Sequence, residues 1–350
     1  MSAIPFFSVL IIPACVGFGF VLGGLSSFLT IVLVFGLIPI LDALIGLNTS
    51  NPAAADEKAL AAATGYQLLT WLCAAVQVAL VLWGVALFAG TALTIAERLG
   101  LILSLGICSG GMGIVVSHEL IHRIDNRLEP LLGRIALASV LYLHWAIEHI
   151  AGHHRTVATP EDPATARKNE SYYAFWPRTV FGGIQSAWDI EAGRLRRRGK
   201  SAFRPANRLL RYAAIEILLI SLVLIIFGWK GVIGYVAQAL VAISLLELVN
   251  YIEHYGLQRR KENINSYEPV RSVHSWNAAH RLTNYLLFNL QRHPDHHKRP
   301  ARRYQTLRHF EKSPQLPAGY ATMVLLALCP PLWFKIMNPR IPHFEKSREK

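Results

Sequence analysis

The chain has 350 residues, of which 53% are hydrophobic and 16% are charged, and its mean hydropathy is +0.33. A soluble protein carries charge on about a quarter of its residues, so this composition excludes an ordinary soluble enzyme and indicates a membrane protein. The net charge of +13 is unevenly placed, because only Lys58 and Arg98 precede His118 and the other 33 basic residues follow it. This pattern excludes a uniformly basic nucleic-acid-binding protein and is typical of loops that stay in the cytoplasm.

A helix needs about 20 apolar residues to cross the hydrocarbon core of a membrane. Six stretches of the sequence predict such helices, namely residues 4–24, 26–47, 66–90, 99–117, 212–229 and 231–252. Three of them carry one acid each, Asp42, Glu216 and Glu247, and we expect these acids to face protein rather than lipid. Two shorter apolar stretches, 132–147 and 319–334, are expected to be embedded or interfacial helices.

The basic residues also predict the orientation of the chain. With the N-terminus in the cytoplasm, four spans return the chain there at His118, and residues 118–211 contain 15 Lys and Arg. Two further spans return it near Tyr251. We therefore expect a single all-α integral membrane domain over residues 1–350, with about six transmembrane helices and a cytoplasmic helical cap made of segments 118–211 and 253–350.

Histidines are concentrated in the second part of this sequence, where 12 of the 14 lie between His118 and His297. They form three groups and one single residue, which are His118 and His122; His149, His153 and His154; His293, His296 and His297; and His254 at the end of the sixth span. Residues four apart on a helix share a face, so His118 and His122 are expected to point the same way, as are His149 and His153.

All four sets fall at the predicted cytoplasmic ends of the spans, where they can converge at one depth. A single tetrahedral zinc site uses four ligands, so nine imidazoles indicate two metal ions. Imidazole binds iron, copper and zinc alike, and the ligand type alone does not name the metal. The His-Glu-Leu-Ile-His motif at His118 also matches the zinc metalloprotease signature, but that interpretation leaves seven candidate ligands unexplained.

Carboxylates usually hold the second ring nitrogen of a ligating histidine. The candidates are Glu119, Glu148, Glu161, Asp162, Glu253 and Asp295, and each can equally form a salt bridge with one of the many arginines. Of the remaining histidines, His144, His309 and His343 have no partner at ligand spacing and are expected to pack or lie on the surface. His274 and His280 lie close to the third group in sequence and are expected to have a supporting role, the alternative being that one of them is a ligand.

The four cysteines, Cys15, Cys73, Cys108 and Cys329, lie in apolar stretches, and none forms a Cys-x-x-Cys pair. The sequence therefore encodes no iron–sulfur or rubredoxin-type module of its own, and any electrons must come from a separate protein. Eight basic residues of the predicted cytoplasmic face can attract an acidic carrier, although they can equally serve only to set the topology. They are Arg194, Arg196, Arg197, Arg198, Lys200, Arg299, Arg302 and Arg303.

These histidine motifs resemble those of the membrane fatty acid desaturase and hydroxylase superfamily and, within it, the membrane alkane 1-monooxygenases, or alkane ω-hydroxylases. The resemblance runs from about His118 to Pro339. It is carried by segments 118–123, 148–167, 250–257, 274–277, 290–297 and 302–308. Segment 250–257, which reads NYIEHYGL, is the most specific pointer to the alkane hydroxylases.

The resemblance implies a di-iron centre in which two iron ions are held only by histidines, with no haem and no flavin in this chain. Carried over by motif, the ligands are His118, His122, His149, His153, His154, His254, His293, His296 and His297. Asn250 is implied as a catalytic residue that meets the centre through a water molecule.

The implied reaction is R–CH3 + O2 + 2 electrons + 2 protons → R–CH2OH + H2O, on the terminal methyl group of a medium- or long-chain alkane. The implied partners are a rubredoxin-type electron carrier with its NAD(P)H-dependent reductase, membrane lipid and the hydrocarbon substrate, and no nucleic acid. The implied location is the bacterial inner membrane, with the active site on the cytoplasmic side. Asp42, Ala43 and Leu44 are candidates to line a substrate tunnel, although packing is the commoner role for such residues.

Two departures from the family pattern leave the substrate class open. Pro294 stands where a serine is usual, and the first motif ends in Ile-His-Arg rather than Gly-His-Lys. An aryl-methyl (xylene-type) or terpene-methyl monooxygenase is therefore the alternative. A fatty acyl desaturase is disfavoured by the NYIEHYGL segment, and a non-catalytic membrane metal carrier by nine ligands at one depth, which would trap a metal ion rather than pass it on.

Overall fold

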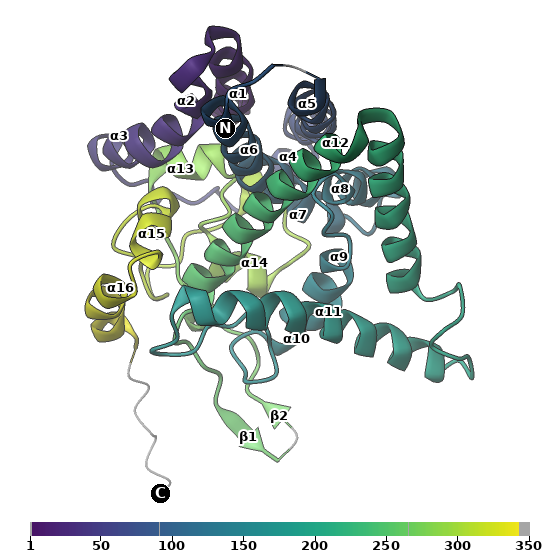
Figure 1. Cartoon of the computed structure of the whole chain (residues 1–350). Coiled ribbons are helices and arrows are strands. Elements are labelled where there is room, and N and C mark those ends of the chain that lie inside the picture. The colour runs from purple at the N-terminus through teal and green to yellow at the C-terminus, as the bar shows by residue number, and fades with distance from the viewer. Residues whose placement is uncertain (1, 91, 265, 343–350) are drawn as a thin grey trace, which may run out of the picture.

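A computed structural model describes residues 2–90, 92–264 and 266–342, which form helices joined by loops and one small two-stranded hairpin (Figure 1). Within these ranges, five helical segments are long and apolar enough to cross a membrane, namely Ile4–Leu22, Gly24–Ile45, Glu57–Gly90, Ile95–Ile121 and Arg208–His254. The all-α membrane fold expected from the sequence is thereby confirmed.

The first two of these segments are irregular helices that meet at Gly23. The first contains η1 (Ile4–Leu10) and α1 (Ile11–Leu22). The second contains η2 (Gly24–Phe28), α2 (Leu29–Ile31), the π-helical η3 (Val32–Leu37) and α3 (Ile38–Ile45). Gly23 has a φ of 70°, a conformation that glycine adopts without strain, and it lets the chain turn between the two segments.

The third and fourth segments carry the chain toward the histidines. They consist of α4 (Glu57–Ala62), α5 (Thr64–Gly90), α6 (Ile95–Cys108), the π-helical η4 (Ser109–Ile114) and α7 (Val115–Ile121). Thr94 and Glu97 form a capping box at the start of α6, which satisfies backbone N–H groups of its first turn. The fourth helix extends past the expected end at Ser117, so His118 lies within it.

The expected fifth and sixth spans are the two arms of α12 (Arg208–His254). Gly228 interrupts this helix with φ 66° and ψ −172°, and in Figure 1 the two arms run in different directions on either side of a bend. Only glycine adopts such a conformation readily, so the chain reverses here without a separate loop.

The remaining elements form the cap and the C-terminal part of the fold. They are α8 (Leu128–Ala138), α9 (Trp145–Glu148), the π-helical η5 (His149–His153), α10 (His154–Thr156), α11 (Tyr172–Arg196), β1 (Lys261–Asn263), β2 (Ser266–Tyr267), η6 (Ser272–His274), α13 (Arg281–Leu286), α14 (His293–Lys298), η7 (Tyr304–Thr306), α15 (Tyr320–Ala327), α16 (Pro330–Met337) and η8 (Asn338–Arg340). The strands β1 and β2 pair antiparallel, and their hairpin projects from the molecule (Figure 1). The two shorter apolar stretches each contribute to two short helices, and neither forms a single helix long enough to cross a membrane.

The three acids within the apolar segments face protein groups, as expected. Asp42 accepts hydrogen bonds from the backbone N–H and the hydroxyl of Thr283 and so joins the second span to α13. Glu216 accepts from the backbone N–H of Leu143, and Glu247 accepts from the hydroxyl groups of Tyr142 and Thr179. Each acid therefore ties a membrane helix to the cap.

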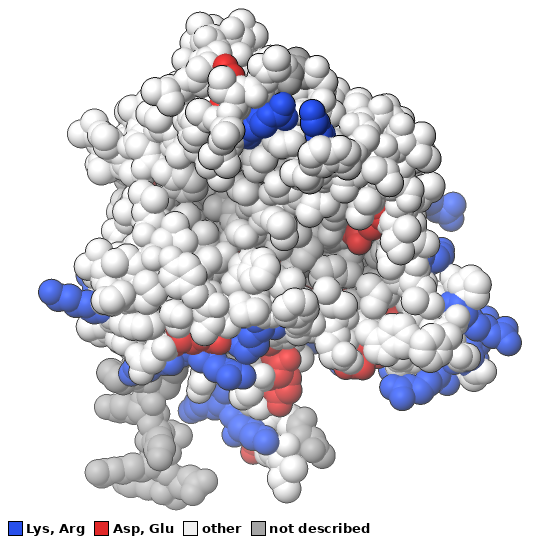
Figure 2. Space-filling view, in the orientation of Figure 1, with Lys and Arg blue, Asp and Glu red and all other residues white. Residues whose placement is uncertain are grey.

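Charged side chains gather over the lower part and right edge of the molecule in Figure 2, whereas much of its upper half is uncharged. Exposed apolar side chains such as Phe18, Val21 and Leu25 lie on the first two helical segments, which occupy the upper part of Figure 1. Such a division suits a protein with one part in lipid and the other in water.

Candidate metal centre

Nine histidine rings from four parts of the fold converge inside the molecule. Residues from α7, from η5 and α10, from the end of α12, and from α14 meet there in two groups, in each of which the candidate ligand atoms lie within 4.8 Å of one another. The first group consists of His118, His122, His149, His154 and His296, and the second of His153, His254, His293 and His297. All are buried except His154, which is half-buried.

The second histidine motif divides between the two groups because it lies on a π turn. The backbone N–H of His154 bonds to the carbonyl of His149, five residues earlier, as in a π-helix. His149 and His154 therefore point into the same group, and His153 points into the other. The expectation that His149 and His153 share a face was wrong, since it assumed an α-helical turn.

The third motif lies on α14 with Pro294 and Asp295 in its first turn. His293 and His297, four residues apart, share the second group, whereas His296 points to the first. One short helix thus contributes to both groups.

The spacing of the ring nitrogens fits a metal ion in each group. In the first, the Nε2 atoms of His118 and His296 are 2.9 Å apart, and those of His122 and His149 are 3.1 Å apart. In the second, the Nε2 atoms of His293 and His297 are 2.9 Å apart. Two imidazole nitrogens bound at about 2.1 Å to one ion, at right angles, are about 3 Å apart. A cation shared by the rings of one group also explains why a ring nitrogen in that group has more than one other ring nitrogen close to it.

His153 shows most clearly which nitrogen is free for a metal. Its Nδ1 lies 2.9 Å from a carboxylate oxygen of Asp162, while its buried Nε2 has no hydrogen-bond partner among the described residues. Burial disfavours the charged ring, but Asp162 outweighs this effect and raises the pKa of His153 to about 9. The carboxylate keeps a proton on Nδ1, so Nε2 is the nitrogen that can bind a metal ion in the second group once it has released its own proton.

Six further rings of the two groups lie in an environment that keeps them neutral, namely His122, His149, His154, His293, His296 and His297. Burial, together with the neighbouring rings, holds their pKa values well below the usual range. Since neutral imidazole is the form that binds metal ions, these rings are ready to act as ligands.

Of the six candidate supporting carboxylates, two touch histidine rings. Asp162 contacts His153, and an oxygen of Glu253 lies 3.2 Å from Nε2 of His293. Two others pair with arginines, Glu119 with Arg123 and Asp295 with Arg302. The remaining pair accept from hydroxyl groups, Glu148 from Ser186 and Glu161 from Tyr267.

The other histidines lie outside the two groups. His144 packs on Tyr142, and Nδ1 of His309 contacts the side-chain amide of Asn277. The carbonyl of His274 lies 3.4 Å from Nδ1 of His254, so His274 supports a member of the second group, as expected. His280 is the residue before α13, and its carbonyl accepts from the backbone of Asn284. His343 lies outside the described residues.

Asn250 lies on α12, one turn before His254. Its side-chain amide donates to Glu247, which also accepts from Tyr142 and Thr179. These contacts fix the orientation of Asn250 within a buried polar network.

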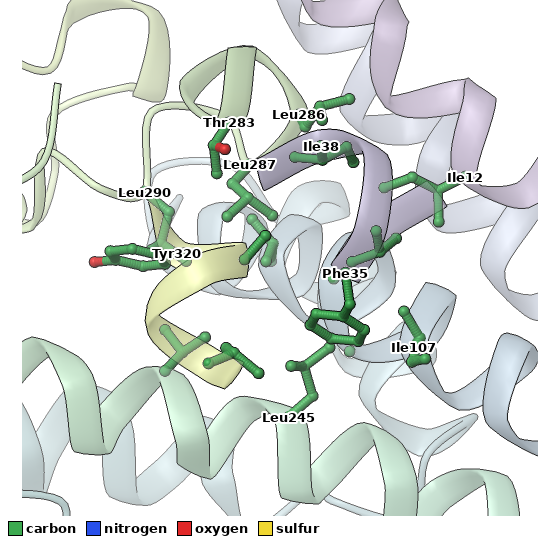
Figure 3. A pocket seen from close by; sticks show the side chains of 17 residues that line it. Ile12, Phe35, Ile38, Ile107, Leu245, Thr283, Leu286, Leu287, Leu290 and Tyr320 are labelled. Atoms are coloured by element: carbon green, nitrogen blue, oxygen red, sulfur yellow. The ribbon is translucent and has the colours of Figure 1, made fainter. Parts of the chain in front are cut away.

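A cavity of about 60 Å³ lies among the helices (Figure 3). Apart from Thr283 and Tyr320, the side chains that line it are apolar, and Phe35, Ile38, Gly111 and Leu245 are among its lining residues. In Figure 3 the ring of Tyr320 borders the cavity. Its hydroxyl donates to Glu253, which contacts His293, so one chain of contacts joins the cavity to the second histidine group.

Tyr320 and Trp145 belong to the site but were not predicted from the sequence. Trp145 stacks on His149 with ring centroids 4.3 Å apart. It stands four residues before His149, a spacing that could have identified it. Tyr320 opens an apolar helix far along the chain, and no local signal connects it to Glu253.

Two expectations about neighbouring surfaces change with the structure. Ala43 and Leu44 are exposed and do not line the cavity, whereas Phe35 and Ile38 of the same segment do. Arg302 is buried between Asp295 and Glu57, and Arg303 pairs with Glu129. Both arginines therefore have a structural role in addition to their charge.

Comparison with known proteins agrees with this site. The model of the fatty acid desaturase family matches residues 97–327. Alkane 1-monooxygenase 2 of Pseudomonas aeruginosa is 44% identical over 92% of this chain and 85% of its own length. An alkane 1-monooxygenase of Acinetobacter baylyi is 42% identical over 89% and 76%, respectively. The chain belongs to the alkane 1-monooxygenase family. This membership makes it an oxidoreductase enzyme of the desaturase superfamily.

A more distant relative is similar to part of the chain. The hydroxylase component of a xylene/toluene monooxygenase from Pseudomonas putida is 30% identical over 71% of this chain and 65% of its own length. The greater identity to the alkane 1-monooxygenases extends along almost the whole chain. Together with the histidine groups, membership of the alkane 1-monooxygenase family indicates a metal cofactor and an electron-transfer partner.

Proposed function

We propose that this protein hydroxylates the terminal methyl group of medium- or long-chain alkanes to primary alcohols with O2. The observation that carries the proposal is the convergence of nine imidazoles in two groups beside an apolar cavity, in a chain 44% identical to an alkane 1-monooxygenase. The cavity offers no charged group to a substrate, which suits a saturated hydrocarbon.

The two histidine groups are proposed to hold two iron ions, one in each. The ligands would be the nine residues His118, His122, His149, His153, His154, His254, His293, His296 and His297. The bound ions would supply the O2-dependent oxidation of an unactivated C–H bond, which protein side chains alone do not perform. Asp162 would keep His153 in the tautomer that binds through Nε2.

The residues around the cavity would bind and position the hydrocarbon. Each CH2 group removed from water contributes about 0.8 kcal/mol to the free energy of binding, so the apolar cavity favours a hydrocarbon chain without any polar contact. Tyr320 would close the end of the cavity nearest the second histidine group, because its hydroxyl is held by Glu253. This packing would also exclude water from the reacting methyl group.

Asn250 is proposed to act at the edge of the centre through a water molecule. The support for this role is its position one turn before His254 and its fixed orientation on Glu247. Its amide would then orient the water rather than bind a metal ion.

We further propose that the centre faces the cytoplasm of a bacterial cell, with the spans in the inner membrane. The support is the distribution of charge, since 33 of the 35 basic residues follow Ser117 in the sequence and most of these belong to the cap segments. A rubredoxin-type carrier, reduced by an NAD(P)H-dependent reductase, would deliver the electrons. A cleft of about 770 Å³ that reaches His122 and is lined by Lys58 and Arg299 offers such a carrier a route to the first group.

The test is a measurement of products and metal on the same preparation. The purified protein, supplied with a rubredoxin and its reductase, is expected to contain about two iron ions per chain and to convert octane and dodecane to 1-alkanols. Preferential oxidation of xylene would favour an aryl-methyl monooxygenase instead. Full activity in a preparation stripped of iron would reject the proposed centre.

A further inference from the structure

A second cleft, of about 500 Å³, lies between α8, the start of α12 and the α9–η5 segment. It is lined by three arginines, Arg127, Arg134 and Arg208, and by the aromatic ring of Tyr212. Among the residues that the structure describes, no carboxylate lines this cleft, whereas Glu57 and Glu129 line the cleft that reaches His122. Its lining therefore favours an anion.

Two of these arginines have no anionic partner within the described part of the chain. No ion pair or hydrogen bond joins the guanidinium groups of Arg127 and Arg134 to another described residue. Arg208 differs, because it is bound to Glu191. Arg134 is half-buried, and a cation withdrawn from water in this way gains most from an anion that enters the cleft.

The cleft lies at the level where membrane segments begin and end. Ile121, the last residue of the fourth apolar segment, and Arg208, the first residue of the fifth, both line it. With these segments in a bilayer, the headgroups would lie near their ends, and anionic lipids there attract nearby arginines.

Apolar side chains extend from the cleft onto the surface of α8. Leu131 and Ile135 are 47% and 44% exposed, and Ile124, which also lines the cleft, is 77% exposed. The first arm of α12 adds the exposed Ile215 and Leu218. A cationic cleft that continues into exposed apolar surface matches a molecule with an anionic head and hydrocarbon tails.

We propose that this cleft binds the headgroup of an anionic phospholipid. The phosphate would pair with Arg127 and Arg134, Tyr212 would lie at the headgroup boundary, and the acyl chains would lie along α8 and the first arm of α12. Because Ile147 and Ile150 flank His149 in sequence and line the same cleft, a bound lipid would also brace the segment that carries the second histidine motif.

The experiment measures the thermal unfolding midpoint of the purified, metal-loaded protein in dodecyl maltoside. Phosphatidylglycerol is expected to raise the midpoint by several degrees, phosphatidylcholine much less, and inorganic phosphate not at all. In R127Q/R134Q most of the phosphatidylglycerol effect should be lost, and native mass spectrometry should show at least a twofold drop in retained phosphatidylglycerol.

R196Q/R197Q is the matched control, because it removes the same charge from exposed residues at the end of α11. It should respond to phosphatidylglycerol like the unmodified protein, and R127K/R134K should retain most of the response. The proposal would be overturned if R127Q/R134Q responded to phosphatidylglycerol as strongly as the unmodified protein, or if R196Q/R197Q lost as much of the response as R127Q/R134Q. It would also be overturned if inorganic phosphate raised the midpoint as much as phosphatidylglycerol. Should R127Q/R134Q not fold, the same criteria apply to R127Q, at an exposed position.

Discussion

Asp162 is the residue whose effect on the centre is easiest to isolate, because it contacts His153 without belonging to either histidine group. In Asp162→Asn the carboxylate that fixes the His153 tautomer is lost, and metal affinity is expected to fall by roughly 10–100-fold. Iron per chain after dialysis against a graded series of chelator concentrations measures this. Glu161→Gln, at the neighbouring exposed carboxylate, is the control and should keep its iron. If both variants kept the same amount of iron, the role of Asp162 in holding His153 would be contradicted.

Gly111 offers a direct test of the cavity. It lines the cavity, and a Cβ added there would meet no atom within 4 Å, so the backbone at this position leaves open space for a side chain. We expect Gly111→Leu to lower the ratio of dodecane to hexane turnover by roughly tenfold or more, since a single methylene in an apolar pocket changes specificity by about 10–200-fold. Gly17→Leu, also in open space but away from the cavity, should leave the ratio unchanged.

At the scale of elements, the fourth and fifth membrane segments must approach closely to bring His118 and His254 together. Gly106 of α6 permits this, because an added Cβ would lie 2.8 Å from the carbonyl oxygen of Gln238 and closer still to Val241 on α12. Gly106→Ala is therefore expected to lower stability by about 1–3 kcal/mol and to reduce bound iron. Gly111→Ala in the same helical segment should be neutral or slightly stabilising. Thermal unfolding and iron content, measured together, distinguish the two variants.

The elements also differ in how well the sequence predicts them. The membrane helices follow from local hydropathy, and the nine histidines follow from their number and spacing. Their division between two groups did not follow, because a single π turn moves His154 rather than His153 onto the face of His149. The cavity was missed for another reason, since Phe35, Gly111, Leu245 and Tyr320 come from distant segments and meet only in the folded chain.

For the whole molecule, the distribution of charge predicts where an electron carrier docks. Lys58 and Arg299 are exposed at the cleft that reaches His122, whereas Arg302 and Arg303 are bound to carboxylates. We expect Lys58→Glu/Arg299→Glu to lower carrier-dependent turnover about tenfold at low salt, and less at high salt, because steering of an acidic partner is lost. The initial rate against carrier concentration at two ionic strengths measures the effect. Arg197→Glu/Arg198→Glu should change it little; an equal decrease would point to general attraction rather than docking at this cleft.

The centre also joins parts of the fold that are distant in sequence, since α7, η5, α12 and α14 each supply histidines to it. Buried ring nitrogens of each group lie 2.9–3.1 Å apart, and a metal ion that binds them only in the folded state stabilises that state. Chelation is therefore expected to lower the unfolding midpoint and to speed hydrogen exchange in 149–156 and 293–298, while α5, which supplies no histidine, keeps its exchange rates. Equal acceleration in α5 would indicate general loosening of the protein, and unchanged exchange at the histidine motifs would mean that these elements hold their positions without the metal.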